Sequence, residues 1–267
     1  MTTRRSFAKL TAVGIAMAAL PSMACTVKLD IGIGAYSYHN LSMEEMIVQL
    51  NALGIRDIEM SRGELMLMNH PDEGMFRSAK AKLDQAGIRC VSYYPATIKE
   101  GSDLERAIRF GQILGVKNIT GDASGSMLQQ IDQRLTQEGL TFGIHNHYFP
   151  HEKFAYETPE EVMNALAPLS QTMGATGDVG HFASCGHDPV DALRKLAPRL
   201  KLVHLKDIQA VDGEINVLLG KGISKIPQVM QELHRQRFAG LVAVEYEKEG
   251  DVNHDMRQEI EYARKLA

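Results

Sequence analysis

Short apolar runs alternate with amphipathic segments from residue 29 to the end of the chain. Successive runs begin 24 to 41 residues apart, which is room for one strand, one helix and two loops. Such a unit places consecutive strands parallel, because each helix returns the chain to the edge where the strand began. The pattern predicts eight strands, beginning near Leu29, Ile55, Ile88, Val116, Leu140, Met173, Leu200 and Leu241.

The predicted helices are bounded by residues that cap helices. A glycine directly precedes five of the strands, and glycine readily adopts the left-handed conformation that ends a helix. Capping boxes predict three helix starts, and a proline marks the first helical position in two places. The glycines are Gly54, Gly87, Gly115, Gly139 and Gly240; the boxes begin at Ser42, Ser102 and Thr158; the prolines are Pro159 and Pro189.

Eight strand–helix units in about 240 residues predict an α/β fold, the (β/α)8 TIM barrel. A doubly wound open sheet is the alternative, and it often carries a glycine-rich phosphate loop after its first strand. Here that strand ends with Gly32 and Gly34 but lacks the third glycine, so we interpret these glycines as making room inside a barrel. No linker divides the chain, and the barrel is predicted as a single domain over residues 25–267.

Residues 1–24 have the three-part pattern of a signal peptide. Basic residues come first, an apolar run over residues 10–20 follows, and small residues precede Cys25. The run is too short to span a bilayer. Its leading motif, Arg-Arg-Ser-Phe-Ala-Lys, resembles a twin-arginine export signal, so we predict a periplasmic protein. Ser22 stands where a lipobox has leucine, and a lipid anchor on Cys25 is therefore not favoured.

The charge of the chain argues against a nucleic-acid partner. It has 29 basic and 33 acidic residues, for a formal net charge of −4. Removal of residues 1–24 would take away three basic groups and no acidic group, leaving −7. A protein that binds nucleic acid is usually basic. The three cysteines, Cys25, Cys90 and Cys185, are too few and too scattered for a disulfide framework or a zinc ribbon.

Ionisable residues gather where the predicted strands end. In a TIM barrel these ends form the rim that carries the active site. Side chains alternate along a strand, so His145 and His147 share one face, and Glu245 and Glu247 share another. The candidate residues at this rim are Glu59, His145, His147, Asp178, His181, His204, Lys206, Glu245 and Glu247.

A divalent metal is the simplest way to balance the charge of these residues. Carboxylates without a counter-charge are costly to bury. A mixed set of imidazole nitrogens and carboxylate oxygens suits manganese, zinc, cobalt or iron(II) better than calcium, and magnesium also stays open.

The rim motifs resemble those of the xylose isomerase-like barrel superfamily. This group includes ketose 3-epimerases, hydroxypyruvate isomerase, inosose dehydratase and metal-dependent apurinic endonucleases. The resemblance runs from about residue 29 to the end of the chain. It rests on Ile58-Glu59-Met60, Asp178-Val-Gly-His181, His204-Leu-Lys-Asp207, Leu219-Gly-Lys-Gly222 and Val244-Glu245-Tyr-Glu247.

The resemblance implies a single metal held from four consecutive strands. Asp178, His204 and Glu245 match three of the family's ligands. His145 stands where the family often has glutamate, and in a subgroup with His-Asn-His at this place it is the ligand by position. A family histidine that contacts substrate matches His181. The other predicted substrate contacts are Tyr36, Glu59, Lys206 and Glu247.

The implied chemistry is proton removal from the carbon beside a metal-polarised carbonyl of a sugar. Glu245 is the predicted base, and His147 or His181 the acid or base opposite. The sequence therefore predicts a metal-dependent sugar isomerase or epimerase. A lyase or hydrolase of 3-keto glycosides at the same site is the alternative, and a carbohydrate-binding barrel without activity is a third possibility. The endonuclease branch is disfavoured by the acidic charge.

Structural explanations compete for some of these residues. Lys206 and Asp207 alternatively form a surface ion pair, and Glu59 alternatively pairs with Arg62. The methionines at 66, 68 and 75 either fill the core or line an apolar wall of the pocket. Barrels of this family often dimerise, so a homodimer is an open expectation.

Overall fold

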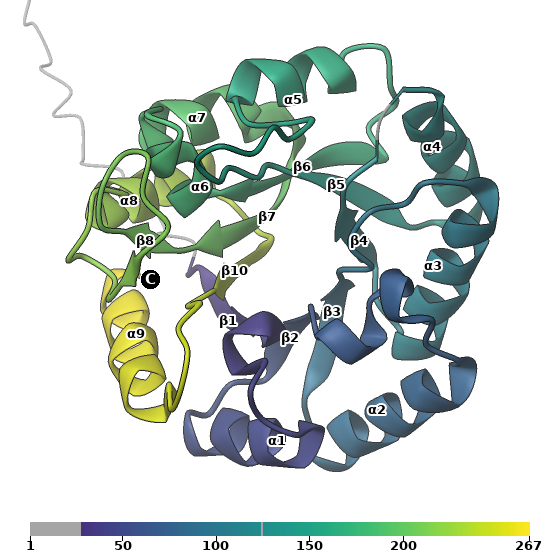
Figure 1. Cartoon of the computed structure of the whole chain (residues 1–267), viewed down its shortest axis with the longest axis horizontal. Coiled ribbons are helices and arrows are strands. Elements are labelled where there is room, and N and C mark those ends of the chain that lie inside the picture. Colours follow the sequence, from purple (N-terminus) through teal and green to yellow (C-terminus); the bar gives the residue numbers. More distant parts are fainter. Residues whose placement is uncertain (1–27, 124) are drawn as a thin grey trace, which may run out of the picture.

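The computed structural model describes residues 28–123 and 125–267, and they form the predicted barrel. Eight parallel strands close in the order β1-β10-β7-β6-β5-β4-β3-β2, with helices around them (Figure 1). The closed barrel confirms the TIM fold and excludes the open sheet. Its strands are β1 (Asp30–Gly34), β2 (Asp57–Met60), β3 (Arg89–Tyr93), β4 (Asn118–Gly121), β5 (Thr141–His145), β6 (Met173–Asp178), β7 (Leu200–Leu205) and β10 (Leu241–Val244).

The outer helices each bury one apolar face against the strands. In α2, Phe76, Ala79 and Leu83 recur three and four positions apart and are buried. Phe76 also stacks on Phe110 of the next helix, with ring centroids 4.0 Å apart. The helices are α1 (Met43–Ala52), α2 (Glu73–Gln85), α3 (Gly101–Leu114), α4 (Ser126–Glu138), α5 (Pro159–Leu166), α6 (Val179–Ser184), α7 (Pro189–Leu196), α8 (Ile226–Gln236) and α9 (Asn253–Leu266).

Most of the predicted helix boundaries are confirmed. The hydroxyls of Ser42 and Thr158 each accept a hydrogen bond from the backbone N–H of the glutamate three residues on, completing two capping boxes. Four of the helix-ending glycines have positive φ angles between 63° and 77°, namely Gly54, Gly87, Gly115 and Gly139.

Two predicted boundaries are wrong. Helix α3 begins at Gly101, and the hydroxyl of Ser102 bonds to the Glu100 side chain instead of capping the helix. Helix α8 ends before Gly240, because Arg237 itself adopts the left-handed conformation, with φ of 53°. Gly240 is instead required by close packing, since a Cβ there would lie 2.3 Å from the carbonyl oxygen of Lys201.

The barrel interior is apolar at one end and polar at the other. Gly32 faces inward, where a Cβ would lie 2.3 Å from the carbonyl oxygen of Asp57. Leu202, Leu241 and Ala243 form a small buried cluster on the inward face near the strand starts. His204 lies two residues beyond Leu202, and Glu245 two residues beyond Ala243, on the same inward face. The floor of the barrel is therefore packed, and ionisable groups are confined to the opposite rim.

Two small features were not predicted. Strand β6 is followed at once by the six-residue helix α6, and strand β7 is followed by a hairpin of β8 (Asp207–Ile208) and β9 (Asn216–Val217). Elements of two or six residues are too short to show a hydrophobic period. The hairpin accounts for the long interval before β10.

The predicted signal peptide over residues 1–24, and Cys25, lie outside the described residues. Within residues 28–123 and 125–267, no helix has the length and apolar character needed to cross a bilayer.

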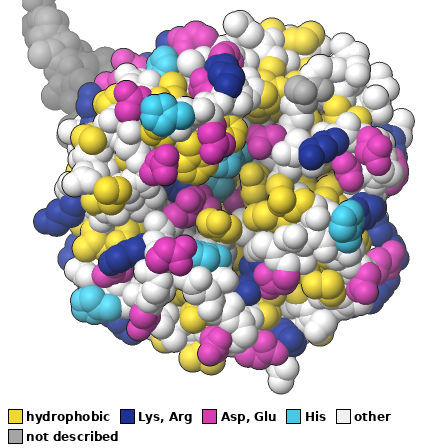
Figure 2. Space-filling view, viewed as in Figure 1, with side chains coloured by type: hydrophobic (Ala, Val, Ile, Leu, Met, Phe, Trp, Pro, Cys, Tyr) yellow, Lys and Arg dark blue, Asp and Glu magenta, His cyan; other side chains and the backbone are white. Residues whose placement is uncertain are grey.

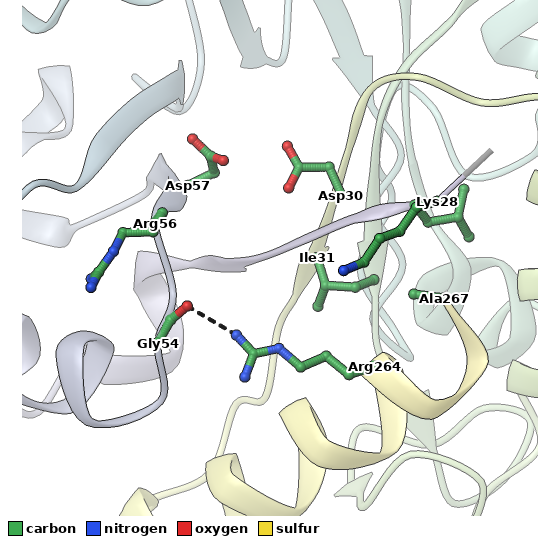
Figure 3. Close-up of a pocket in the computed structure, with 9 residues that line it drawn as sticks. Lys28, Asp30, Ile31, Gly54, Arg56, Asp57, Arg264 and Ala267 are labelled. Atoms are coloured by element: carbon green, nitrogen blue, oxygen red, sulfur yellow. Dashed lines mark hydrogen bonds between the residues drawn. The ribbon is translucent and has the colours of Figure 1, made fainter.

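The end of the barrel where the strands begin carries a cavity of about 440 Å³ (Figure 3). Two of its charged side chains, Asp57 and Arg264, are held by structural hydrogen bonds. Asp57 accepts two hydrogen bonds of 2.6 Å from Arg89, and the Arg264 guanidinium donates to the carbonyl oxygen of Gly54 at 3.0 Å. This end of a TIM barrel serves stability, and catalysis takes place at the other end.

Glu259 in α9 is expected to make stability depend on pH. Its carboxyl is 1% exposed and accepts a hydrogen bond from the Leu219 backbone N–H, and burial raises its pKa to about 8. The native protein then holds a proton that the unfolded chain releases above its ordinary pKa near 4.5. Stability should therefore fall between pH 5 and 8, by up to about 1.4 kcal/mol per pH unit.

Urea unfolding of the native chain and of Glu259→Gln at pH 5, 6.5 and 8 measures this contribution. The free-energy difference between the two proteins should shift steadily in favour of the variant as pH rises. A difference that is constant across this range would show that Glu259 is ionised in the native state.

Candidate active site

The side chains predicted as metal ligands converge at the C-terminal ends of the strands, in one buried cluster. His204 lies at its centre, with Nδ1 3.0 Å from His145 Nε2 and 3.0 Å from Glu245 Oε2. Oδ2 of Asp178 is 3.7 Å from each of these two histidine nitrogens. None of the four residues is more than 6% exposed. They follow or end β5, β6, β7 and β10, whose parallel arrangement brings these ends to one rim.

Asp178 is held so that one carboxylate oxygen points into the cluster. Oδ1 accepts a hydrogen bond of 2.9 Å from the His181 backbone N–H and so caps α6. The side chain of Asn146 fixes the backbone of Asp178 by accepting from its N–H and donating to its carbonyl. Oδ2 is fully buried and has no hydrogen-bond partner among the described residues. It forms an ion pair with Lys206 Nζ at 3.2 Å and lies 3.7 Å from ring nitrogens of His145 and His204. The oxygen thus faces nitrogens that are suitable ligands of a divalent cation.

Glu59 of β2 fixes the orientation of the His204 ring. Its Oε2 lies 2.5 Å from Nε2 of His204 and accepts a hydrogen bond from the N–H of that nitrogen. This bond directs Nδ1 towards the cluster. The other oxygen of Glu59 accepts a hydrogen bond of 3.0 Å from the Ser92 hydroxyl. Hydrogen bonds then link the Ser92 hydroxyl to that of Thr120, and the Thr120 hydroxyl to that of Thr176. Glu59 was expected to contact substrate or to pair with Arg62. The pair with Arg62 is not formed, because Arg62 pairs with Glu64 and Glu59 is fully buried against His204.

Replacement of Glu59 by glutamine should weaken metal binding about 10–100-fold while leaving the fold intact, because a neutral amide no longer raises the basicity of His204. The dissociation constant of Mn²⁺ or Zn²⁺, measured by titration of metal-free protein, checks this. Glu64→Gln is the matched control, since Glu64 lies in the segment directly after β2 and its carboxylate pairs with Arg62. Equal affinities of Glu59→Gln and the native chain would contradict the positioning role.

Lys206 is buried among the carboxylates of the cluster. Its Nζ lies 3.2 Å from Asp178 Oδ2 and 3.5 Å from Glu245 Oε2, and it donates to Glu247. Burial alone would lower the pKa of Lys206, but these three carboxylates outweigh it and raise that pKa well above its usual value. The expected surface pair of Lys206 with Asp207 is wrong. Asp207 is also buried and instead accepts backbone hydrogen bonds from the loop over residues 220–224.

The single ammonium does not balance the carboxylates around it. Four carboxylates share two cationic partners, Lys206 and the imidazole of His204. The carboxylates are those of Glu59, Asp178, Glu245 and Glu247. Burial would lower the pKa of His204, but Glu245 and Glu59 raise it well above its usual value. The metal-free cluster thus attracts a proton to His204, where a divalent cation would supply the missing positive charge. The donor set of His145, Asp178 and His204, whose ligand atoms all lie within 4.8 Å of one another, fits such an ion.

Two neutral imidazoles lie beside the cluster. Burial lowers the pKa of His181 to about 3, and burial with its neighbours His145 and His181 lowers the pKa of His147 well below its usual value. Nδ1 of His181 donates to the carbonyl oxygen of Tyr148 at 3.0 Å. Its Nε2 is therefore an unprotonated acceptor, and it lies 3.8 Å from Asp178 Oδ2. His147 stacks on Phe154, with ring centroids 5.2 Å apart.

Asp122 completes a second group of possible metal ligands. It was not predicted as a ligand from the sequence. Its carboxylate lies with His145 and His147 so that their ligand atoms are within 4.8 Å of one another. Burial raises the pKa of Asp122. His145 thus stands between two clusters, with Nε2 facing His204 and Nδ1 buried without a hydrogen-bond partner among the described residues.

A cavity of about 270 Å³ opens onto the cluster. Of the predicted site residues, His145, His147, His204, Glu245, Tyr36 and Glu247 line it, whereas Asp178, His181, Lys206 and Glu59 lie behind this lining. Figure 2 shows hydrophobic side chains next to the acidic and histidine side chains at the centre of this face. Met66 and Met68, which were expected either to fill the core or to line the pocket, line it as well. The other lining residues were not predicted as site residues, namely Ser61, Tyr94, Ala96 and Phe149.

Curated proteins with similar sequences are named for rhizopine catabolism and for the dehydration of inosose. The "Rhizopine catabolism protein MocC" of Rhizobium meliloti is 25% identical over 151 residues, covering 51% of this chain and 45% of MocC. An "Inosose dehydratase" of Geobacillus kaustophilus (strain HTA426) is 25% identical over 262 residues, covering 80% of this chain and 82% of the dehydratase. The chain thus spans less than half of MocC.

Solved structures share the fold at low sequence identity. The probable 3-DHS dehydratase AsbF from Bacillus anthracis superposes with a TM-score of 0.71 at 14% identity, covering 87% of this chain and 98% of AsbF. The IOLI protein, solved with a bound zinc atom, superposes with a TM-score of 0.69 at 13% identity, covering 89% of this chain and 96% of that chain.

A family model built on many such proteins matches residues 47–266, which include seven of the eight barrel strands and the whole histidine and carboxylate cluster. On this match, the chain belongs to the xylose isomerase-like TIM barrel family.

Proposed function

We propose that this chain is a metal-dependent, sugar-modifying enzyme that removes a proton from the carbon beside a carbonyl group, as an isomerase or epimerase does. The observation that carries the proposal is the convergence of His145, Asp178, His204 and Glu245 in one buried cluster, in which His204 Nδ1 lies 3.0 Å from His145 and Glu245 and 3.7 Å from Asp178. The curated relatives named for dehydration of inosose, and solved neighbours named as epimerases, support a sugar as substrate.

His145, Asp178, His204 and Glu245 would hold the divalent metal. When bound, such an ion polarises a carbonyl and stabilises negative charge on its oxygen. Glu59 keeps His204 in the tautomer that leaves Nδ1 free to bind. Asn146 and the first turn of α6 hold Asp178 in place.

Glu245 is the base in this proposal. Its carboxylate lines the cavity and so is within reach of a substrate carbon. Burial would raise the pKa of Glu245, but Lys206 and His204 outweigh it and hold that pKa below its usual value. The carboxylate is therefore ionised at neutral pH and ready to accept a proton.

His147 is the group that would act on the opposite side of the substrate. It lines the cavity, and its low pKa keeps the ring neutral, so one nitrogen carries a proton to donate and the other is free to accept one. His181 lies behind it, at 4.5 Å between ring centroids, with its acceptor nitrogen on the side of Asp178. An epimerase that returns a proton on the other face would use His147.

Elimination is the second candidate reaction. The residues at the end of β5 that line the cavity are imidazoles, and those after β10 are carboxylates. The two proposed proton-transfer groups, His147 and Glu245, therefore differ in chemistry. In an elimination Glu245 takes the proton from the carbon beside the carbonyl. The electrons of that C–H bond form a C=C bond, and the substituent on the next carbon leaves with its bonding pair and receives a proton from His147. The relatives named as dehydratases favour this candidate.

Exchange of substrate protons with solvent tests the proposal. Metal-free and Mn²⁺-loaded protein would be incubated in D₂O with a panel of ketoses, inososes and 3-keto glycosides, and deuterium uptake followed by NMR. Metal-dependent uptake with a rearranged sugar supports isomerisation, and uptake with an unsaturated product or a freed substituent supports elimination. Sugar binding without uptake on any member of the panel would show a binding protein instead.

We also propose that the Arg-Arg motif directs export to the periplasm. In a host with the twin-arginine system, combined Arg4→Lys and Arg5→Lys substitutions should abolish the mature form in the periplasmic fraction and leave the precursor in the cytoplasm. Lys9→Arg is the matched control and should be exported normally. Intact precursor of the unaltered chain in the cytoplasm, with none in the periplasm, would refute the proposal.

A further inference from the structure

We propose that the cavity takes an uncharged sugar that carries an apolar substituent, such as the aryl group of a glycoside, and that it does not take a sugar phosphate. This inference rests on the proposed function, because it assigns the reacting part of the substrate to the metal cluster. Its new content is a subsite for the substituent, formed by Met66, Met68 and Phe149.

One part of the cavity wall is apolar, and its Phe149 ring lies beside the His147 ring, with centroids 5.5 Å apart. Met66 and Met68 come from the loop after β2, and Phe149 comes from the loop after β5, so the wall is assembled from segments 80 residues apart. Met68 is 70% exposed although it lines a cavity next to buried, charged groups. A flexible thioether in this position is available to cover an apolar surface that enters from solvent.

The cavity offers no free cation for a phosphate group. Among the described residues that line it there is no lysine or arginine, and Glu245 and Glu247 add negative charge. The two buried cations nearby are already engaged. Lys206 is held by Asp178, Glu245 and Glu247, and Arg62 donates to Glu64 and to the carbonyl oxygens of Tyr38 and Leu41. With the divalent ion engaged by the carboxylates and imidazoles of the cluster, a phosphate ester would find no cationic side chain free to bind it among the described lining residues.

The size of the cavity limits the substituent. About 270 Å³ is close to the lower end of the range for small-molecule sites, which begins near 300 Å³. One sugar ring and one compact group fill such a volume, and a polysaccharide chain would extend beyond it. We assign the reacting end of the substrate to the imidazoles and carboxylates of the lining, and the substituent to Met66, Met68 and Phe149.

Calorimetric binding to the full-length mature protein with Mn²⁺ tests the subsite, using phenyl β-D-glucoside, methyl β-D-glucoside and glucose 6-phosphate as probes. We expect the phenyl glucoside to bind about tenfold more tightly than the methyl glucoside, from burial of the ring, and the phosphate to bind no better than the methyl glucoside. Met68→Ser should remove most of the phenyl preference and Met68→Leu should keep it. Met75→Ser is the matched control, because Met75 is an exposed methionine on α2 outside this cavity.

Two results would overturn the subsite. One is equal binding of the phenyl and methyl glucosides, or no binding of either, and the other is a phenyl preference that Met68→Ser leaves unchanged. Deuterium exchange on the 3-keto forms of both glucosides, run on the same preparations, separates this inference from the proposed function. Exchange without a phenyl preference would leave the function standing and reject the subsite. A phenyl preference lost in Met68→Ser, with no exchange, would support the subsite and reject the function.

Discussion

Replacement of Asp178 by asparagine should abolish metal binding and lower kcat/KM by about 10³-fold or more, because the metal contributes several kcal/mol to stabilisation of the transition state. The asparagine side chain has the same shape, and its oxygen can still accept the His181 backbone N–H that now caps α6. What is lost is the charged Oδ2 at 3.7 Å from His145 and His204. Metal content by elemental analysis and turnover of the same preparation measure both effects.

The control for this variant is Asp191→Asn, an exposed aspartate that pairs with Arg194 on α7. It should keep metal and activity. The competing explanation is that Lys206 alone is the counter-ion of the cluster, since its Nζ lies 3.2 Å from Asp178. Purified protein without divalent metal, whose turnover is unaffected by a chelator, would establish that explanation and reject the metal.

Replacement of Glu245 by glutamine should slow proton transfer by about 10²–10⁴-fold, which is the contribution typical of a positioned general base. The amide fits the same space but cannot accept the substrate proton. Because Glu245 also lies 3.0 Å from His204 Nδ1, some loss of metal affinity is expected as well. Deuterium exchange at saturating Mn²⁺ isolates the effect on proton transfer.

Glu249→Gln is the matched control, since Glu249 is four residues further along and its side chain is 94% exposed. It should exchange deuterium at the native rate. A Glu245→Gln variant that exchanges at the native rate with saturating metal would move the role of base to His147, and His147→Gln would then be the variant to measure.

The architecture was predictable because every structural unit repeats a local signal. The strand starts near Met173, Leu200 and Leu241 agree with β6, β7 and β10, and the capping boxes at Ser42 and Thr158 are formed. The errors at Ser102 and Gly240 have one cause. A local motif shows which backbone conformations are favourable, but tertiary contacts decide which conformation forms. At Gly240 the glycine is required by the close approach of the Lys201 backbone and does not end a helix.

The candidate site was predictable to the extent that strand alternation determines it. His145 and His147 occupy one face of β5 and its extension, and both reach the cavity together with Glu245 and Glu247. The alternation of side chains along a strand does not determine how deeply each side chain is buried. Glu59 and Lys206, which are predicted substrate contacts, lie buried behind the residues that line the cavity, where Glu59 orients His204 and Lys206 pairs with three carboxylates.

The sequence by itself determined the barrel, the rim that carries the chemistry and the types of side chain on it, because these follow from residue periodicity and from which end of a strand a residue occupies. Only the tertiary structure decided which nitrogen of His204 faces Glu59, which oxygen of Asp178 faces the cluster, and which methionines line the cavity. Those outcomes depend on distances between residues far apart in the chain, which closure of the barrel sets.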